Sequence, residues 1–341
     1  MNTKTADIDW ANLPFGYVKT DFNIRYLYSN GKWSKEELTR DEYIPMHIAA
    51  SCLHYGQEAF EGMKAFETKD GRIVVFRPEA NSKRLQKTSR RIFMPEIPEK
   101  MFLDAVNKVV LANKKFVPPY GTGASLYIRP LVIGTGAKVG LGPADEYMFI
   151  IFVTPVGPYY KGGLTPVKAL VVTDFDRAAP NGVGDCKVGG NYAAGLSGGQ
   201  YGKDLGYPVV LYLDSKEKKY IDEFSTSNFI AIKGNTYITP VSNSILQSIT
   251  NDSLATVARD KGMKVEKRQI NIEEIAEFDE VGAVGTAAVV TPVHLIHYNG
   301  KDYTFHKENE AGPVITSLYE AFTGIQKGEV KDSHNWLFEI K

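Results

Sequence analysis

The segment Gly182–Tyr192 places one lysine, Lys187, among four glycines and shortly before an aromatic hydroxyl. Backbone with this density of glycine can adopt positive φ angles and approach a bound molecule closely. A lysine amine held in a desolvated setting loses its proton readily and forms Schiff bases with carbonyl groups. The segment therefore indicates an imine-forming lysine, the kind of residue to which pyridoxal phosphate attaches.

The spacing alone leaves another interpretation of this loop open. A glycine-rich stretch is commonly a flexible surface loop, in which the lysine would simply be solvated. A phosphate-binding loop of the nucleotide type is not indicated, because the order G-x-x-x-x-G-K-[ST] is absent.

Length and composition narrow the class of protein. The chain has 341 residues, enough for two domains or one large α/β unit. Its 40 basic and 40 acidic residues cancel, which argues against a nucleic-acid-binding protein. The N-terminus lacks the apolar run of a secretory signal, and the longest apolar stretch, 148–153, is too short to cross a bilayer. Because the chain has only two cysteines, Cys52 and Cys186, we expect a soluble, cytoplasmic protein from a reducing compartment.

Apolar periodicity predicts strands and helices throughout, in two parts separated by the turn-rich stretch Gly157–Pro166. Two hairpins are expected near the N-terminus, around Ser29–Lys32 and Lys69–Gly71. The other expected strands are 124–133, 146–156, 167–173, 209–213, 228–232 and 236–239. The expected helices are 102–110, 192–203, 245–260 and 314–326, and one that Asn81 caps and that runs through Arg91.

Six separated segments resemble the class IV aminotransferases, and specifically the branched-chain amino acid aminotransferases. Besides the lysine loop, they are Leu53–Phe66, Phe76–Asn81, Ser125–Pro130, Asp222–Asn228 and Gly285–Val290, in the same order as in that family. The resemblance implies an α/β enzyme of fold type IV that binds pyridoxal 5'-phosphate between two domains. We expect a small N-terminal α/β domain at 1–156, a linker at 157–166 and a larger cofactor-binding domain at 167–341.

The resemblance also assigns residues to the cofactor. Glu223 would keep the pyridine nitrogen protonated, so that the ring can accept electrons, although Asp222 would be equally plausible without the resemblance. Tyr192 would donate its hydroxyl to the ring oxygen. Arginine and a helix N-terminus are good phosphate ligands, and the matching positions are Arg84, Ile249, Thr250 and Thr286. The chain departs from the family here, because Gln247 and Ser248 stand where many relatives have Pro-Gly.

The substrate positions that the resemblance implies combine aromatic walls with one arginine. They are Tyr55, Phe60, Tyr127, Arg129 and Tyr159, with Thr226 and the amide of Ala287 for the α-carboxylate. Strand alternation places Tyr127 and Arg129 on the same face, where the pair could receive the distal carboxylate of glutamate. In relatives the loop that matches Val139–Leu141, together with the Tyr55 position, reaches into the partner subunit's site, which implies a homodimer.

These assignments imply reversible transamination of leucine, isoleucine and valine with 2-oxoglutarate, through a Schiff base between Lys187 and pyridoxal phosphate. The alternatives are another class IV enzyme, such as a D-amino acid aminotransferase or aminodeoxychorismate lyase, and a non-catalytic ligand-binding protein of the same fold. A Cys-x-x-Cys thiol switch found in some relatives is excluded, because Ala288 and Thr291 occupy its positions. Cys186 is expected to be a packing residue. His294 and His297 lack a third ligand, so no metal site is expected.

Overall fold

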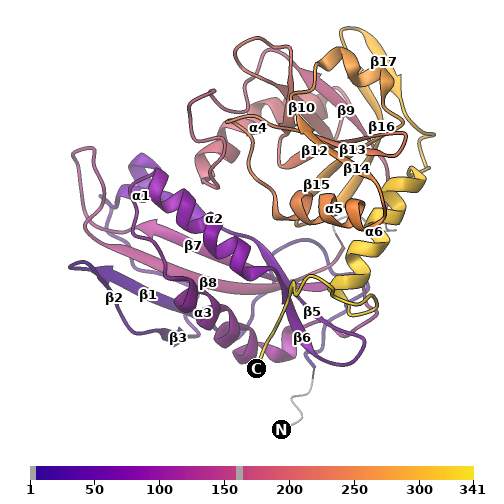
Figure 1. The fold of residues 1–341 in the computed structure, drawn as a ribbon. Coiled ribbons are helices and arrows are strands. Elements are labelled where there is room, and N and C mark those ends of the chain that lie inside the picture. The colour runs from indigo at the N-terminus through magenta and orange to yellow at the C-terminus, as the bar shows by residue number, and fades with distance from the viewer. Residues whose placement is uncertain (1–4, 159–163) are drawn as a thin grey trace. The chain divides into compact units, whose positions relative to one another are not determined.

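The computed structural model describes residues 5–158 and 164–341 (Figure 1). Backbone contacts divide the chain into two compact units. Unit 1 comprises Met1–Tyr159, Cys186–Gly189 and Ile325–Lys341, and unit 2 comprises Tyr160–Asp185 and Gly190–Gly324. The lysine of the glycine-rich loop therefore belongs to unit 1. Tyr159 and residues 160–163 of the expected linker lie outside the described residues.

Unit 1 contains a sheet of nine strands within the described residues, and its neighbouring strands pair antiparallel. The order is β18-β6-β5-β7-β8-β1-β2, with β3 beside β1 and β4 beside β7. The strands are β1 Asn23–Ser29, β2 Lys32–Trp33, β3 Glu37–Thr39, β4 Glu58–Phe60, β5 Met63–Glu67, β6 Ile73–Phe76, β7 Ser125–Gly134, β8 Tyr147–Val156 and β18 Leu337–Glu339. The two predicted hairpins are confirmed as β1–β2 and β5–β6. The C-terminal strand β18 returns to pair with β6.

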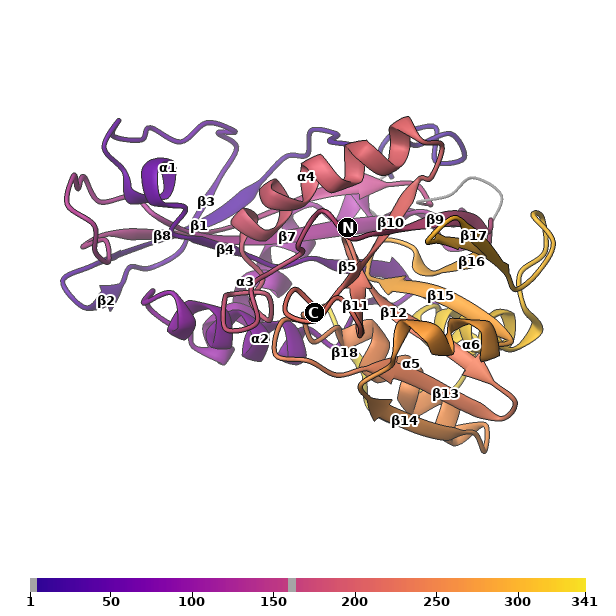
Figure 2. The ribbon, with the colours of Figure 1, turned by 90° about the horizontal axis from the view of Figure 1, so that it is seen from above.

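The two faces of β7 have different roles because its side chains alternate. Leu126 and Ile128 are fully buried in the unit 1 core, together with Phe102 and Val106 of α3. Helices α2 (Pro78–Arg91) and α3 (Glu99–Ala112) pack against each other and lie along this face (Figures 1 and 2). A short helix α1 (Ser51–Tyr55) and a 3-10 turn η1 (Lys114–Phe116) complete the unit. Tyr127 is on the opposite face, as the alternation predicted.

The start of α2 differs from the prediction. The helix begins at Pro78, with Arg77 as its N-cap residue, and Asn81 lies inside it. Proline fits the first helical turn because the N–H that it lacks has no partner there. The predicted capping role of Asn81 is therefore wrong. Its buried side chain instead donates to Glu61 Oε2, with a distance of 2.7 Å.

Unit 2 contains a second sheet, again of nine strands among the described residues, in the order β11-β10-β9-β16-β15-β12-β13-β14. Because β11 also pairs with β12, six of these strands form a closed ring of pairings. Strand β17 extends the sheet beside β16. The strands are β9 Val167–Val172, β10 Val209–Leu213, β11 Ile221–Phe224, β12 Ser227–Lys233, β13 Thr236–Pro240, β14 Lys264–Arg268, β15 Glu280–Gly285, β16 Val289–Tyr298 and β17 Lys301–Thr304.

The helices of unit 2 begin at other residues than predicted. They are α4 Gly189–Asp204, α5 Ile249–Asp260 and α6 Pro313–Gln326, with a 3-10 turn η2 at Ile272–Glu277. Helix α5 was predicted from residue 245, but it starts later because the hydroxyl of Ser248 accepts from Asn251 N and caps the helix there. Helix α4 starts three residues before Tyr192, so this tyrosine lies on the first helical turn rather than on the glycine-rich turn.

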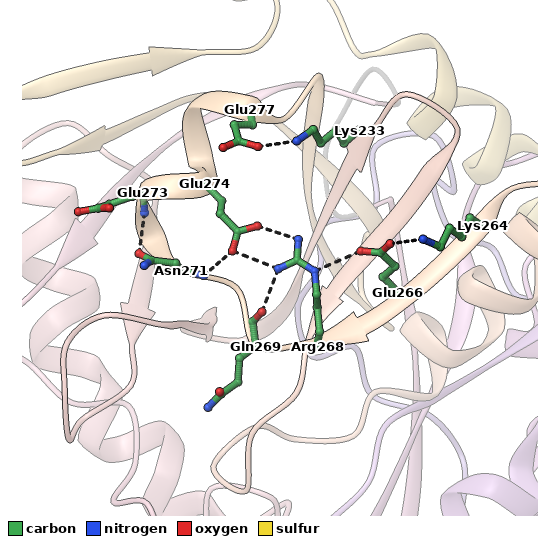
Figure 3. A network of polar contacts seen from close by, with 9 residues as sticks. All are labelled: Lys233, Lys264, Glu266, Arg268, Gln269, Asn271, Glu273, Glu274 and Glu277. Atoms are coloured by element: carbon green, nitrogen blue, oxygen red, sulfur yellow. Dashed lines mark hydrogen bonds and ion pairs between the residues drawn. The ribbon is translucent and has the colours of Figure 1, made fainter.

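A polar network covers the edge of unit 2 beside β14 (Figure 3). The guanidinium of Arg268 pairs with Glu274 at 2.7 Å and with Glu266 at 3.1 Å. Asn271 caps η2 in a reciprocal arrangement with Glu274. Because the side chains of Arg268 and its partners are partly exposed, each pair contributes only about 0.2–1 kcal/mol. The network mainly orients η2 against β14. Across residues 5–158 and 164–341, no helix has the length and apolar character needed to cross a membrane.

Asn113, at the end of α3, connects that helix to the start of β1. Its completely buried side chain accepts from the N–H groups of Asp21 and Phe22, both at 3.0 Å, and donates to the carbonyls of Phe22 and Val109. We expect Asn113→Ala to lower the free energy of unfolding by about 2–4 kcal/mol, because buried backbone groups would lose their partners. Urea denaturation would measure this loss. The matched variant Asn107→Ala, on the same helix but at a more exposed position, should cost less than about 1 kcal/mol; equal losses would contradict the assignment.

Candidate active site

Lys187 is fixed by its backbone to two elements of unit 1. Its N–H donates to the hydroxyl of Thr88 on α2 at 3.2 Å, and its carbonyl accepts from the N–H of Phe60 on β4 at 3.1 Å. The flanking residues Cys186 and Val188 are buried, which confirms the packing role predicted for Cys186. The amine lies 4.8 Å from the centroid of the Phe60 ring. The lysine is therefore held in place, and the interpretation as a solvated surface loop is wrong.

The surroundings of the Lys187 amine oppose its positive charge. Desolvation, together with the smaller effect of the nearby Arg84 guanidinium, lowers the pKa of this amine from its usual 10.5 to about 8. The carboxylate of Glu61 acts in the opposite direction. A lysine in this setting has a substantial neutral fraction near physiological pH, which is the form that attacks a carbonyl.

Arg84 is anchored by a buried carboxylate that the sequence patterns did not single out. Its Nε and Nη2 donate to the two carboxylate oxygens of Glu61, at 2.8 and 2.7 Å. Glu61 is completely buried and also accepts from Asn81. This two-point pairing fixes the plane of the guanidinium. Glu61 lies within the matched segment Leu53–Phe66, but nothing in its spacing distinguished it from the neighbouring glutamates.

Arg129 and Tyr127 meet on the same face of β7, as predicted. Nη2 of Arg129 donates to the Tyr127 hydroxyl at 3.1 Å, and the guanidinium carbon lies 4.8 Å from the Phe60 ring centroid. The Nε atom of Arg129 is buried and has no hydrogen-bond partner within the described residues. A buried N–H without an acceptor is costly, so this group is available to an anionic ligand.

The hydroxyl of Tyr127 needs a glycine beside it. A Cβ atom on Gly62 would lie 2.2 Å from that hydroxyl, so any larger residue would displace the tyrosine. Phe15 packs edge-on against the Tyr127 ring, with centroids 5.7 Å apart. Sequence reasoning did not propose Phe15 as a wall of this site, because it precedes β1 in a stretch with no periodic pattern.

Glu58 brings a second carboxylate close to the lysine loop. It accepts from the N–H of Gly189, where a Cβ atom would lie 2.4 Å from the carboxylate oxygen. Burial raises the pKa of Glu58, and the Gly189 N–H and the charge of Arg129 oppose that rise. This contact joins β4 to the residues that follow Lys187, and its only signal in the sequence was the position of Glu58 in a matched segment.

Tyr55 contacts the 139–141 loop. Its hydroxyl donates to the carbonyl of Val139. Val139 and Leu141 are 83% and 86% exposed, values that are unusual for aliphatic side chains. Beside them lies a pocket of about 400 Å³, lined by Tyr55, Gly56, Gln57, Ile92, Phe93, Leu141, Gly142 and Pro143.

In unit 2, Glu223 is a buried carboxylate on β11 with three donors. Oε1 accepts from Arg177 Nε at 2.9 Å and from the N–H of Leu246 at 3.0 Å, and Oε2 accepts from Asn228 Nδ2 at 2.8 Å. Burial raises the pKa of Glu223 from 4.5 to about 7, and Arg177 is the strongest influence that opposes the rise. The neighbouring Asp222 accepts from the Ser244 hydroxyl at 2.7 Å.

The remaining predicted residues of unit 2 lie on turns and helix starts. Thr226 is in the β11–β12 turn, and Thr286 and Ala287 are in the β15–β16 turn. These turns are adjacent, because a Cβ atom on Gly285 would lie 3.7 Å from the Thr226 carbonyl oxygen. Ile249 and Thr250 open α5, where the first N–H groups have no partner within the helix. Tyr192 lies on the first turn of α4.

Comparison with known proteins now identifies the family. The family model described as amino-transferase class IV matches residues 58–296. The chain is 44% identical to the branched-chain-amino-acid aminotransferase of Haemophilus influenzae over 342 residues, which cover 98% of this chain and 99% of the relative. It is also 44% identical to that of Helicobacter pylori over 337 residues, 98% of each. The chain belongs to the class IV aminotransferases.

Solved structures agree with this assignment. The branched-chain amino acid aminotransferase from Escherichia coli superposes with a TM-score of 0.75 at 29% identity, covering 95% of this chain and 100% of that one. A second branched-chain amino acid aminotransferase, from T.th. and complexed with N-(5'-phosphopyridoxyl)-L-glutamate, gives a TM-score of 0.74 at 27% identity, covering 93% and 98%. The aminotransferase therefore has the α/β architecture of fold type IV and depends on pyridoxal 5'-phosphate.

The residues of the aminotransferase fit that cofactor. A lysine with a lowered pKa can bind its carbonyl carbon, and an ionisable buried carboxylate can pair with its ring nitrogen. An arginine and the N-terminus of α5 offer donors suited to a phosphate. Within the described residues, no cluster of three histidine, cysteine or acidic side chains could hold a metal ion.

We expect the rate at which the apoenzyme forms a Schiff base with pyridoxal to reach half its maximum near pH 8, because only the neutral amine of Lys187 reacts. An unperturbed lysine would place this midpoint near pH 10.5. Stopped-flow absorbance measurements across this pH range would test the expectation. Since burial also lowers the pKa of Lys64 to about 8, borohydride trapping and peptide mapping are required. A label on Lys64 or Lys203, or an unchanged rate in Lys187→Met, would refute the assignment.

Proposed function

We propose that this aminotransferase transfers the amino group of leucine, isoleucine or valine to 2-oxoglutarate, reversibly, giving branched-chain 2-oxo acids and glutamate. The observation that carries the proposal is the group around Lys187: the aromatic rings of Phe60 and Tyr127 with Arg129, whose buried Nε lacks a partner within the described residues. Aromatic surface accommodates an aliphatic tail, and the guanidinium can pair with a second carboxylate. The relatives named as branched-chain aminotransferases support this substrate class.

Bound pyridoxal phosphate supplies the carbonyl that receives the amino group and a ring that withdraws electrons from the substrate α-carbon. We assign to Lys187 the attachment of the cofactor. Once the substrate amine has displaced it, the Lys187 amine would take the proton from the substrate α-carbon and deliver it to the carbon that held the cofactor's carbonyl. In the reverse half-reaction it would carry a proton in the opposite direction. Its lowered pKa suits this task, because a base that titrates near the working pH can both accept and release a proton.

The other cofactor contacts follow from the predicted assignments. Glu223 would accept a hydrogen bond from the N–H of the pyridine ring, and Tyr192 would donate a hydrogen bond to the ring oxygen. The phosphate would bind the guanidinium of Arg84, the N–H groups of Ile249 and Thr250, and Thr286. Glu61 holds the guanidinium of Arg84 through Nε and Nη2, which fixes the direction from which this arginine would meet the phosphate.

We assign the substrate α-carboxylate to Thr226 and the amide of Ala287, which lie on adjacent turns of unit 2. Phe60 and Tyr127 would line the pocket for the aliphatic tail, and Tyr159 remains a proposed wall residue on the strength of the resemblance. Arg129 would receive the distal carboxylate of glutamate. One site could then accept both kinds of amino acid, because the guanidinium forms a hydrogen bond to Tyr127 when no second carboxylate is present.

We also propose a cytoplasmic homodimer. The support is the exposure of Val139 and Leu141 beside the apolar pocket next to Tyr55, since exposed aliphatic side chains around a pocket are typical of a protein interface. A second copy of the chain would cover this surface, and Tyr55 with the 139–141 loop would contribute to the partner's site.

Glu223→Gln should retain the cofactor but lower the rate of α-proton loss from leucine by about 10²–10³-fold, the usual effect of removing one preorganised electrostatic contact. The amide cannot keep the pyridine nitrogen protonated, so the ring withdraws fewer electrons. Single-turnover absorbance measurements would give this rate. The matched control is Glu266→Gln, in the surface network of Figure 3, which should leave the rate unchanged. A parent-like rate in Glu223→Gln would exclude the proposed role.

Arg129→Ala should lower kcat/KM for glutamate by about 10–100-fold, the equivalent of losing a charged hydrogen bond of about 1.5–3 kcal/mol. Leucine carries no second carboxylate, so its half-reaction should change by no more than a few-fold. The two half-reactions have to be measured separately, with donor panels that include isoleucine and valine. Arg72→Ala, which removes an exposed arginine from the same unit, serves as the control. Equal losses for both donors would show that Arg129 supports the strand instead of reading the substrate.

A further inference from the structure

Arg177 is a buried arginine in the segment between β9 and the lysine loop, and neither the sequence patterns nor the assignments above include it. Only 7% of its surface is exposed. Its Nε pairs with Glu223 Oε1 at 2.9 Å, while Nη1 donates to the carbonyls of Gly184 and Ser244, at 2.9 and 3.0 Å. One guanidinium thus contacts three separate segments of unit 2.

Each of these segments carries or adjoins a residue with a proposed role toward the cofactor. Gly184 lies three residues before Lys187, and Ser244 precedes Ile249 and Thr250 at the start of α5. Gly184 also approaches Ser244 so closely that a Cβ atom on it would lie 2.2 Å from the Ser244 carbonyl oxygen. The arginine therefore lies at a junction where backbone segments are already in contact and where no larger side chain fits at position 184.

The hydrogen bonds around Glu223 leave one oxygen less occupied than the other. Oε1 has two donors, Arg177 and the Leu246 N–H, whereas among the described residues Oε2 has Asn228 Nδ2 alone. A carboxylate oxygen can accept about two hydrogen bonds, so Oε2 retains acceptor capacity. Asn228 in turn accepts from Asn251, on the first turn of α5, at 3.1 Å. The orientation of the carboxylate is consequently linked to the position of that helix.

We propose that Arg177 is a positioning residue that holds Glu223 as a carboxylate, with Oε2 directed to the ring nitrogen of the cofactor, and that keeps the backbone at Gly184 and the loop before α5 in register with it. This inference rests on the role proposed for Glu223. Arginine suits the task because its planar fork donates to three acceptors in fixed directions, which the single ammonium of lysine cannot do.

The charge of Arg177 matters as well as its geometry. The charged groups that act on Glu223 are Arg177, which favours the carboxylate, and Asp222 on the same strand, which disfavours it. Burial also favours the protonated acid. Without Arg177, the proton shared between Glu223 and the ring nitrogen should therefore move toward Glu223, and the ring nitrogen should become neutral.

The test is the ¹⁵N chemical shift of the ring nitrogen in holoenzyme loaded with ¹⁵N-labelled pyridoxal phosphate, recorded as a function of pH. In the parent enzyme the nitrogen should stay protonated at neutral pH. In the Arg177→Met variant, the apparent pKa of the ring nitrogen should fall by about one unit or more. Arg177→Lys should show a smaller fall, because it restores the charge without the fork. Arg268→Met, which removes the arginine at the centre of Figure 3, is the matched control and should leave the shift unchanged.

The Glu223→Gln variant distinguishes a failure of the role proposed for Glu223 from a failure of the role proposed for Arg177. If that variant keeps a protonated ring nitrogen, the role of Glu223 itself is wrong. If Glu223→Gln loses the proton while Arg177→Met titrates like the parent, only the inference about Arg177 is overturned. If Arg177→Met does not fold, the pH titration of the ring nitrogen is done with Arg177→Lys. A titration midpoint equal to that of the parent enzyme then overturns the inference.

Discussion

Desolvation of charged groups is the constraint on which the rest of the molecule depends. For the chain on its own, the pKa of Lys187 falls from 10.5 to about 8, so the unfolded chain binds more protons between these two pH values. The resulting cost to folding, up to roughly 3 kcal/mol, is fully present below pH 8 and disappears as the pH rises toward 10.5. Glu223 acts in the opposite direction, since its raised pKa makes stability fall as the pH rises from 4.5 to about 7. Both buried groups therefore lower the stability of the fold over part of the pH range, and both titrate near neutral pH, where a group can accept and release a proton.

In each compact unit, the buried charged groups are stabilised by ion pairs and hydrogen bonds to residues of the same unit. In unit 1, Glu61 balances Arg84 and the backbone of Lys187 is tied to Thr88 and Phe60. In unit 2, Arg177 balances Glu223. Removing one member of a buried pair leaves the other uncompensated, which is more damaging than never having had the pair. The supporting residues are thus as constrained as the residues that would touch the cofactor.

Sequence patterns predicted the elements with a strong local signal and missed the partners that come from distant segments. Strand alternation correctly placed Tyr127 and Arg129 on one face of β7, because a period of two is a property of the strand itself. Helix starts were less predictable: Pro78 starts α2 before Asn81, and Ser248 caps α5 after the apolar pattern has begun. The family resemblance carried the choice of Glu223. It did not include Arg177, because its distance from Glu223 along the chain hides a contact that only the folded unit creates.

The glycines around Lys187 also have a role that the local sequence pattern did not predict, because it depends on contacts with distant residues. The density of glycine around Lys187 suggested a need for positive φ angles, yet Gly184 and Gly189 do not adopt them and are required for space. A Cβ atom at either position would collide with Ser244 or with Glu58. Gly62, outside the loop, is required for the same reason by the Tyr127 hydroxyl. Close approach, rather than freedom of the chain, therefore explains these glycines, and it gives a lysine loop that is held in one place so that its amine can act on a fixed target.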